Sequence, residues 1–391
     1  GGGKRDWLGE HQLFVVDVAD RSTRLVSSDY DRTPEDMMWS PDSRSLWWDG
    51  AMNSTSQLFR VNADGSGFRN VSSADAMIAD TNIDWKNNRV AFVYQSLTAP
   101  PDIFVSDLKA FAPRQLTHQN DRMRGRELGD TRVIHWKNPK DGLEIEGLLT
   151  LPPNHQRGAR VPLLTFVHGG PASRFDQAFL GYLGHIYAPH ALAAQGYAIL
   201  RPNPRGTGGY GSKFRAANRN DWAGMDWIDI NAGIDAVIAQ GIADPDRLGL
   251  MGWSYGGFMA SWAIGHSDRF KAISVGAPVV DLLSFHGTSD IRDFIPSYFP
   301  ASPLALDVLR DHSPLWHLKK SSAHILIQHG EADERVPLSQ GTMLYRVLSE
   351  LGNDVTMVTY PRTPHVAREP RLRIDVARRN LEFFMKWIPA K

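Results

Sequence analysis

The sequence predicts an α/β fold, a mostly parallel sheet with helices on both faces, preceded by a smaller all-β region. Three observations predict it. Up to about residue 125, short apolar segments alternate with turn residues. Beyond that point, strand-like and helix-like patterns alternate. The length of 391 residues is large for one hydrophobic core, which favours two domains, and we place them at residues 1–128 and 129–391.

The all-β region contains a repeat. Residues 57–61 (QLFRV) align with residues 102–106 (DIFVS), and a period of about 45 residues is typical of β-propeller blades. Two and a half repeats cannot close a ring, because propellers have at least about four blades. We therefore interpret residues 1–128 as a partial β-propeller, the C-terminal blades of a truncated one. A small β-sandwich is the alternative.

The second region shows strands and helices in alternation. Strands are expected at residues 133–136, 143–151, 162–168, 198–201, 248–252, 272–275, 325–328 and 355–360. Helices are expected at residues 227–239, 255–265, 338–351 and 371–387. Residues 163–167 (LLTFV) form a continuous apolar run, as expected of a parallel strand buried on both faces.

Composition excludes several function classes. The chain has no cysteine, which rules out disulfides, thiol nucleophiles and Cys-ligated zinc. Lys+Arg and Asp+Glu both number 43, which argues against a nucleic-acid or anionic-membrane surface. No apolar run approaches about 18 residues, so no transmembrane helix is expected. The lack of cysteine suits the cytoplasm, whereas a periplasmic or secreted location stays open because residues 1–5 (GGGKR) do not resemble a natural N-terminus.

A tight turn carries the candidate nucleophile. Residues 252–257 (GWSYGG) follow an apolar strand and precede a helix, so Ser254 occupies a G-x-S-x-G motif in its required context. The glycines permit a cramped backbone that projects the serine hydroxyl above the sheet, and the helix N-terminus supplies positive potential for an oxyanion. The motif predicts an α/β-hydrolase fold with a serine nucleophile.

The partners of the serine are expected on later loops, first an acid and then a histidine. Asp333 follows the strand at 325–328, and His365 follows the strand at 355–360. Both therefore lie at carboxyl ends of strands, where α/β sheets bind ligands. We predict Ser254, Asp333 and His365 as the catalytic triad.

Other residues compete for these roles. The rival acids are Glu331, Glu334, Asp354, Asp281 and Asp290. His168 and His329 also stand at strand ends, but each precedes a glycine, and we expect them to serve packing or loop hydrogen bonding. The loop at residues 168–171 (HGGP) is where this fold places one oxyanion donor, and the residue after the nucleophile supplies the second. We predict the backbone N–H groups of Gly170 and Tyr255.

Residues 206–211 (GTGGYG) match the G-x-G-x-x-G pattern of dinucleotide sites. Two prolines, Pro202 and Pro204, separate the motif from its strand, and residues 212–220 lack an apolar helical stripe. We therefore expect no nucleotide site. No metal or organic cofactor is implied, because proton transfer and oxyanion stabilisation suffice for the chemistry.

Four motifs together resemble the prolyl oligopeptidase family of serine peptidases. They are residues 168–171 (HGGP), 203–211 (NPRGTGGYG), 252–257 (GWSYGG) and 333–337 (DERVP). The HGGP form is most similar to the acylaminoacyl-peptidase and dipeptidyl aminopeptidase branch. The resemblance implies a propeller that caps the catalytic domain and screens out large folded substrates. It also implies that Arg335 binds a substrate carbonyl and that a specificity pocket lies near residues 277–285, with Val336 alongside.

Three functional hypotheses follow. The leading one is a serine peptidase that acts on short peptides or acyl-peptides, an exopeptidase releasing acyl-amino acids or dipeptides through an acyl-enzyme on Ser254. A carboxylesterase with the same triad is the alternative, because an ester has an easier leaving group. A non-catalytic scaffold that binds proteins through its propeller is the third, and the complete triad argues against it. The sequence is also compatible with a homo-oligomer.

Overall fold

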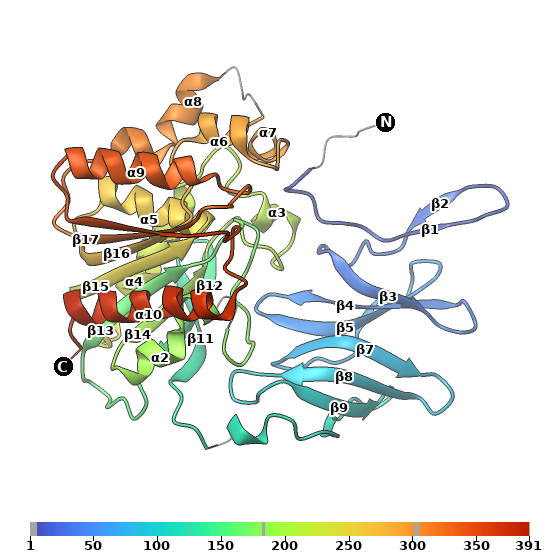
Figure 1. The fold of residues 1–391 in the computed structure, drawn as a ribbon. Helices are drawn as coiled ribbons and strands as arrows, with labels where there is room; N and C mark the ends of the chain where they lie inside the picture. The colour runs from blue at the N-terminus through green and yellow to red at the C-terminus, as the bar shows by residue number, and fades with distance from the viewer. Residues whose placement is uncertain (1–5, 124, 182–183, 301–304, 391) are drawn as a thin grey trace.

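The computed structural model describes residues 6–123, 125–181, 184–300 and 305–390. It contains two eight-stranded sheets in two regions that lie side by side, as Figure 1 shows. The strands of the first sheet lie within residues 34–115, and those of the second lie within residues 130–360. No helix within the described ranges has the length and apolar character needed to cross a membrane.

Two four-stranded antiparallel units build the all-β region. The first unit contains β3 (Pro34–Trp39), β4 (Ser45–Met52), β5 (Thr55–Asn62) and β6 (Arg69–Asn70). The second contains β7 (Met77–Asp84), β8 (Arg89–Gln95), β9 (Asp102–Asp107) and β10 (Arg114–Gln115). A hairpin of β1 (Phe14–Val16) and β2 (Thr23–Leu25) precedes them. The repeated segments at residues 57–61 and 102–106 lie in β5 and β9, the third strand of each unit, so the prediction of propeller blades rather than a sandwich is confirmed.

The second sheet contains all eight strands that the sequence predicts. In spatial order they are β11 (Asp130–Lys137), β12 (Glu144–Leu151), β14 (Ala198–Asn203), β13 (Val161–Val167), β15 (Ala243–Trp253), β16 (Phe270–Gly276), β17 (His324–Gly330) and β18 (Val355–Tyr360). The pairs β11–β12 and β12–β14 are antiparallel, and every pair from β14 to β18 is parallel. The predicted mostly parallel sheet is confirmed.

Helices cover both faces of this sheet (Figure 1). One face carries α4 (Met225–Ala239), α5 (Tyr255–His266) and α9 (Leu338–Glu350), and the other carries α1 (Gly184–Tyr187), α2 (Pro189–Ala194) and α10 (Pro370–Trp387). In β13, Leu163 and Val167 pack into the core that contains α5, whereas Leu164 and Phe166 pack into the core that contains α10. Successive side chains of β13 thus enter opposite cores, which explains why the strand is apolar on both of its faces.

Short helices that periodicity did not reveal lie between β16 and β17. They are α6 (Leu282–Thr288), α7 (Phe294–Tyr298), α8 (Leu306–Asp311) and the 3₁₀ turn η2 (Pro314–His317). Helices of five to seven residues are too short to display a 3.6-residue apolar period. Two of them, α6 and α7, supply part of the site described below.

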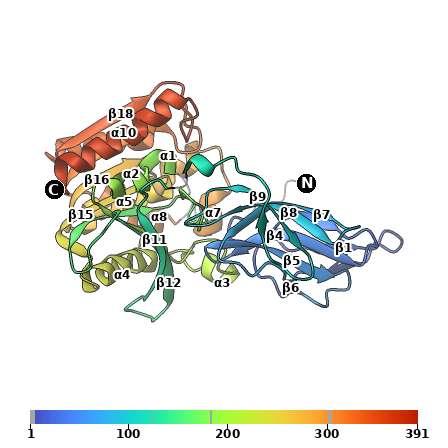
Figure 2. The same cartoon turned by 90° about the horizontal axis from the view of Figure 1, so that it is seen from below.

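The glycine motif at residues 206–211 forms part of the contact between the two regions. Arg32 Nε and the Asn53 N–H both donate to the carbonyl of Gly209, at 2.7 and 2.9 Å. Gly209 has φ +87°, and a Cβ there would lie 3.2 Å from the Cβ of Ala51. Figure 2 shows the following helix, α3 (Ser212–Arg215), between the two regions. The glycine allows this close approach of two backbones.

Candidate active site

Ser254 lies at the junction of β15 and α5, in a sharp turn. Its φ of +62° and ψ of −119° are costly for a residue with a side chain. Its N–H donates to the carbonyl of Gly276 at 2.9 Å. A Cβ on Gly252 would collide with the backbone of Gly256, and a Cβ on Gly256 would collide with the carbonyl of Val167. Only glycines at these two positions let the turn bring the serine to the end of the sheet.

Asp333 is buried in the loop after β17. Its Oδ1 accepts a hydrogen bond from the Val336 N–H at 2.9 Å, and its Oδ2 lies 2.8 Å from His365 Nδ1. Burial acts to raise the pKa of Asp333, but hydrogen bonds from His329 and His365 outweigh it and lower the pKa to about 2. The carboxylate is therefore ionised at neutral pH.

His365 lies in the loop after β18, which packs against the Asp333 loop. The Ala332 N–H donates to the carbonyl of Thr363 at 3.0 Å. The indole N–H of Trp253, the residue before the nucleophile, donates to the His365 carbonyl at 2.7 Å. With Nδ1–H donating to Asp333, the imidazole keeps its Nε2 lone pair to accept a proton.

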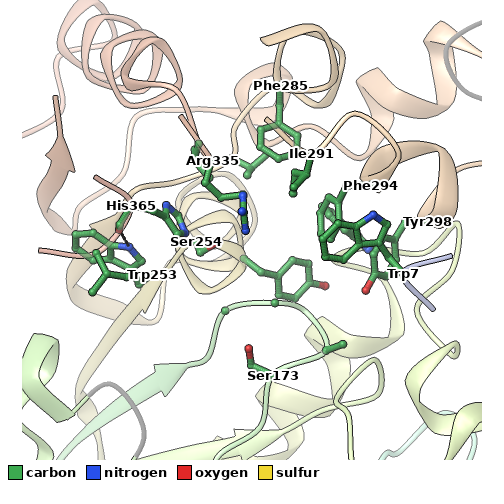
Figure 3. Close-up of a pocket in the computed structure, with 18 of the residues that line it drawn as sticks. Trp7, Ser173, Trp253, Ser254, Phe285, Ile291, Phe294, Tyr298, Arg335 and His365 are labelled. Atoms are coloured by element: carbon green, nitrogen blue, oxygen red, sulfur yellow. Dashed lines mark hydrogen bonds between the residues drawn. The ribbon is translucent and has the colours of Figure 1, made fainter. Parts of the chain in front are cut away.

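Ser254 and His365 line one cavity of about 340 Å³, which we call the active-site cavity. Figure 3 shows the imidazole beside the Ser254 side chain. Since Asp333 holds the other edge of the imidazole, the structure brings together three residues that are far apart in the sequence. In this arrangement a serine hydroxyl, an imidazole and a carboxylate can act as a nucleophile, a base and a group that orients the base.

The loop at residues 168–171 runs past the nucleophile. A Cβ on Gly169 would lie 3.3 Å from the Cβ of Ser254, and both Gly169 and Gly170 line the cavity. Gly170 has φ +118°, a conformation that favours glycine. Tyr255 begins α5, so its N–H belongs to the first turn, where N–H groups have no acceptor within the helix. Both predicted oxyanion donors thus border the cavity.

The rival residues have other contacts. Asp281 accepts from the Ser284 N–H at 3.0 Å and caps α6, and Asp354 Oδ2 lies 2.5 Å from His324 Nδ1. His168 is buried, with Nδ1 2.7 Å from the Gly169 carbonyl and Nε2 3.0 Å from Thr207 Oγ1. Burial lowers the pKa of His168 to about 4. His329 Nε2 donates to the Val336 carbonyl at 2.8 Å. Both histidines are thus held in loop hydrogen bonds.

The wall of the cavity away from His365 is apolar and aromatic (Figure 3). It is formed by Trp7, Trp222, Val279, Phe285, Ile291, Phe294 and Tyr298. Val279 and Phe285 come from the segment in which the specificity pocket was expected. Trp7 was not foreseen: it precedes β1, and its ring meets Phe294 edge-on at 5.3 Å. No local pattern marks it, because it reaches the cavity only through the packing of the two regions.

Arg335 and Val336 also border the cavity. Asp290, a rival acid in the sequence, binds the Arg335 guanidinium through two hydrogen bonds, to Nε at 2.7 Å and to Nη2 at 3.2 Å. Figure 3 shows the guanidinium directed into the cavity. Val336 is buried, and its N–H holds Asp333. Arg335 and Val336 thus connect the cavity wall to the loop that carries Asp333.

Comparison with known proteins identifies the family. The sequence pattern of the prolyl oligopeptidase family matches residues 186–391, more than half of the chain. The chain belongs to the prolyl oligopeptidase family. The resemblance seen in the sequence motifs is confirmed.

Relatives within the prolyl oligopeptidase family are longer than this chain. The peptidase YuxL of Bacillus subtilis (strain 168), which is uncharacterized, is 34% identical over 283 residues, covering 70% of this chain and 41% of that protein. The acylamino-acid-releasing enzyme of Rattus norvegicus is 26% identical over 390 residues, covering 95% of this chain and 52% of that protein. The chain thus spans about half the length of these relatives.

A solved structure of the same family has the same fold. The acylaminoacyl peptidase of Pyrococcus horikoshii matches with a TM-score of 0.84 and 25% identity, over 97% of this chain and 60% of that chain. The likeness extends over both regions, which confirms the predicted α/β-hydrolase fold preceded by part of a β-propeller.

Proposed function

We propose that the chain carries the catalytic site of a serine peptidase that hydrolyses short peptides, as an exopeptidase releasing acyl-amino acids or dipeptides. The observation that carries the proposal is that His365, which is hydrogen-bonded to the buried Asp333, lines the same cavity as Ser254. The similarity to an acylaminoacyl peptidase and an acylamino-acid-releasing enzyme supports the substrate class. We assign residues 129–391 to the catalytic domain and residues 1–128 to the partial propeller.

The proposed reaction uses only groups of this chain. The Ser254 Oγ attacks the substrate carbonyl while His365 Nε2 takes its proton, and Asp333 stabilises the resulting imidazolium. The N–H groups of Gly170 and Tyr255 bind the oxyanion, and each such donor contributes about 3 kcal/mol of barrier lowering. His365 then gives its proton to the leaving amine. Water repeats the sequence and releases the acyl group from Ser254.

The lining of the cavity supports an apolar side chain on the residue whose carbonyl is attacked. Its wall is aromatic and aliphatic, and it also carries two cationic side chains, those of Arg215 and Arg335. Arg215 is paired with Glu10 at 3.0 Å. A cavity of about 340 Å³ accommodates one large side chain. We therefore propose that aromatic and large aliphatic residues are accepted there and that basic residues are rejected.

The test of this function compares two leaving groups. We expect the 391-residue chain to hydrolyse N-acetyl-phenylalanine p-nitroanilide, an amide, as well as p-nitrophenyl butyrate, an ester. A carboxylesterase would cleave the ester and leave the anilide untouched, which would contradict the proposal. A scaffold would do neither and would form no adduct with a serine-directed phosphonate.

We also propose that Arg335 binds a second carbonyl of the substrate through Nη1, since Asp290 engages its Nε and Nη2. Replacing Arg335 with glutamine should raise KM for an acetyl-dipeptide anilide about 10- to 100-fold, because a hydrogen bond to a charged group contributes about 1.5–3 kcal/mol. Turnover of p-nitrophenyl acetate, which has no second carbonyl, should not change.

A matched control for Arg335 is Arg378→Gln, which removes an exposed arginine paired with Asp375 on α10. It should change neither substrate's KM. An equal loss on both substrates in Arg335→Gln would show that the residue maintains the site rather than binding the carbonyl.

A further inference from the structure

A buried carboxyl lies behind Tyr255, the residue that follows the nucleophile. Asp226, in the first turn of α4, has no exposed surface. The Tyr255 hydroxyl donates a hydrogen bond to its Oδ2, and the Trp227 N–H donates to its Oδ1 at 2.8 Å. The mechanism proposed above uses the backbone N–H of Tyr255 but neither its hydroxyl nor Asp226.

The ring of Tyr255 is held on several sides. It meets Trp222 edge-on at 4.9 Å and stacks on Phe258 at 5.3 Å. Asn218 Nδ2 donates to its hydroxyl at 3.4 Å. The bond to Asp226 therefore fixes the far end of the side chain of Tyr255, whose backbone N–H begins α5 and is one of the two proposed oxyanion donors. Through this bond, α4 is tied to the catalytic turn.

The charges around Asp226 oppose its ionisation. Burial, reinforced by the nearby charges of Asp221 and Asp229, raises the pKa of Asp226 to about 8 against the lowering effect of the Tyr255 hydroxyl and the Trp227 N–H. Arg205, which binds the neighbouring Asp229 through Nε at 2.8 Å and Asp141 through Nη1 at 2.8 Å, is already engaged by these two carboxylates. On the α5 and α7 side, the facing groups are Tyr255 itself and Tyr298. Asp226 is thus neutral near pH 7 and becomes negative as pH rises through about 8.

We infer that Asp226 is a positioning residue for catalysis, which holds the oxyanion N–H of Tyr255 in place and opposes oxyanion formation once it ionises. This inference rests on the proposed function. A negative charge behind the oxyanion site raises the energy of a transition state that carries its own negative charge. The consequence is a fall in kcat at alkaline pH, with little change in KM, because the substrate is neutral at its carbonyl.

The experiment measures kcat and KM for N-acetyl-phenylalanine p-nitroanilide between pH 6 and pH 10. The unmodified chain should lose activity with an apparent pKa near 8. Asp226→Asn cannot ionise yet keeps an oxygen that accepts from the Tyr255 hydroxyl, so its alkaline loss should disappear. Tyr255→Phe keeps the ring and the backbone N–H but loses the hydroxyl that is hydrogen-bonded to Asp226. Its kcat at pH 7 should therefore fall about tenfold, less than the fall of about 10²- to 10³-fold that follows the loss of a whole oxyanion donor.

Tyr255→Phe also supplies a second readout if Asp226→Asn does not fold. Because the hydroxyl lowers the pKa of Asp226, its removal should move the alkaline loss to higher pH. The control is Tyr197→Phe, which removes a buried tyrosine hydroxyl that donates to the Ile388 carbonyl at 2.8 Å on the other face of the sheet. It should lower thermal stability and leave kcat and the pH profile unchanged.

Two outcomes overturn the inference: an alkaline loss that is identical in Asp226→Asn and the unmodified chain, or a Tyr255→Phe variant with full kcat and an unmoved profile. In either case, stoichiometric labelling by a serine-directed phosphonate would show that the proposed function still stands. Absence of labelling in the unmodified chain would instead contradict the proposed function itself.

Discussion

Ser254→Ala is expected to lower kcat for N-acetyl-phenylalanine p-nitroanilide by about 10⁴- to 10⁶-fold. Without Oγ no acyl-enzyme forms, and only the oxyanion donors and substrate binding remain to accelerate attack by water. KM should stay within a few-fold, because the cavity wall and Arg335 are untouched. The strained backbone at Ser254 serves only to present this hydroxyl, so the variant should fold as well as the unmodified chain.

The measurement combines steady-state kinetics with mass spectrometry after phosphonate treatment. The unmodified chain should gain one adduct on Ser254, and the variant none. Ser261→Ala is the matched control: this serine lies in α5, the helix that follows Ser254, and its buried hydroxyl donates to the Gly257 carbonyl at 2.8 Å. It should keep full activity. Undiminished turnover in Ser254→Ala would rule out this serine as the nucleophile.

Asp333→Asn is expected to lower kcat about 10⁴-fold with little effect on KM. The carboxylate accepts from His365 Nδ1 and so leaves Nε2 free to take the serine proton. An asparagine amide can donate to Nδ1 instead, which places the imidazole proton on Nε2, the wrong nitrogen. The variant also loses the charge that stabilises the imidazolium.

The structure offers a close control in Asp354→Asn. Asp354 also contacts a histidine Nδ1, that of His324, but this pair is more exposed and lies outside the active-site cavity. The control should retain kcat. If the two variants lost activity equally, the loss would be a general effect of breaking an Asp–His contact and not evidence for the triad.

Asp333 also makes the fold sensitive to acid. Its folded pKa of about 2 lies below the ordinary value of about 3.9, so its ionised form stabilises the folded chain above about pH 4. That stabilisation is lost as pH falls toward 2. Asp333→Asn removes this contribution, so its free energy of unfolding should depend less on pH in that interval than that of the unmodified chain.

Most of the α/β region could be predicted because its elements are long and buried. The strands at residues 163–167 and 325–328 lie between two helical layers and are mostly apolar: the second has the run Ile325-Leu326-Ile327 before Gln328. The helices at residues 227–239 and 371–387 are long enough to show their period. By contrast, α6, α7 and α8 escaped detection, because helices of one or two turns carry no readable periodicity.

The candidate triad could be selected from local motifs and chain order. A G-x-S-x-G turn requires a particular backbone, and parallel strands deliver the loops after β17 and β18 to the same edge of the sheet. What surrounds the triad could not be selected in this way. The pairing of Asp290 with Arg335 joins residues 45 positions apart, and nothing near Asp290 distinguishes it from the other rival acids.

The sequence by itself therefore determined the order of the strands and long helices of the α/β region and the three side chains proposed for catalysis, because backbone requirements and apolar periodicity are local properties of the chain. Only the tertiary structure decided which side chains enclose the cavity and what holds Tyr255. Trp7 reaches Phe294 and Asp226 reaches Tyr255 across distant segments. Such contacts depend on how separate elements pack against one another. The sequence around one residue carries no pattern that identifies the distant residue it will contact.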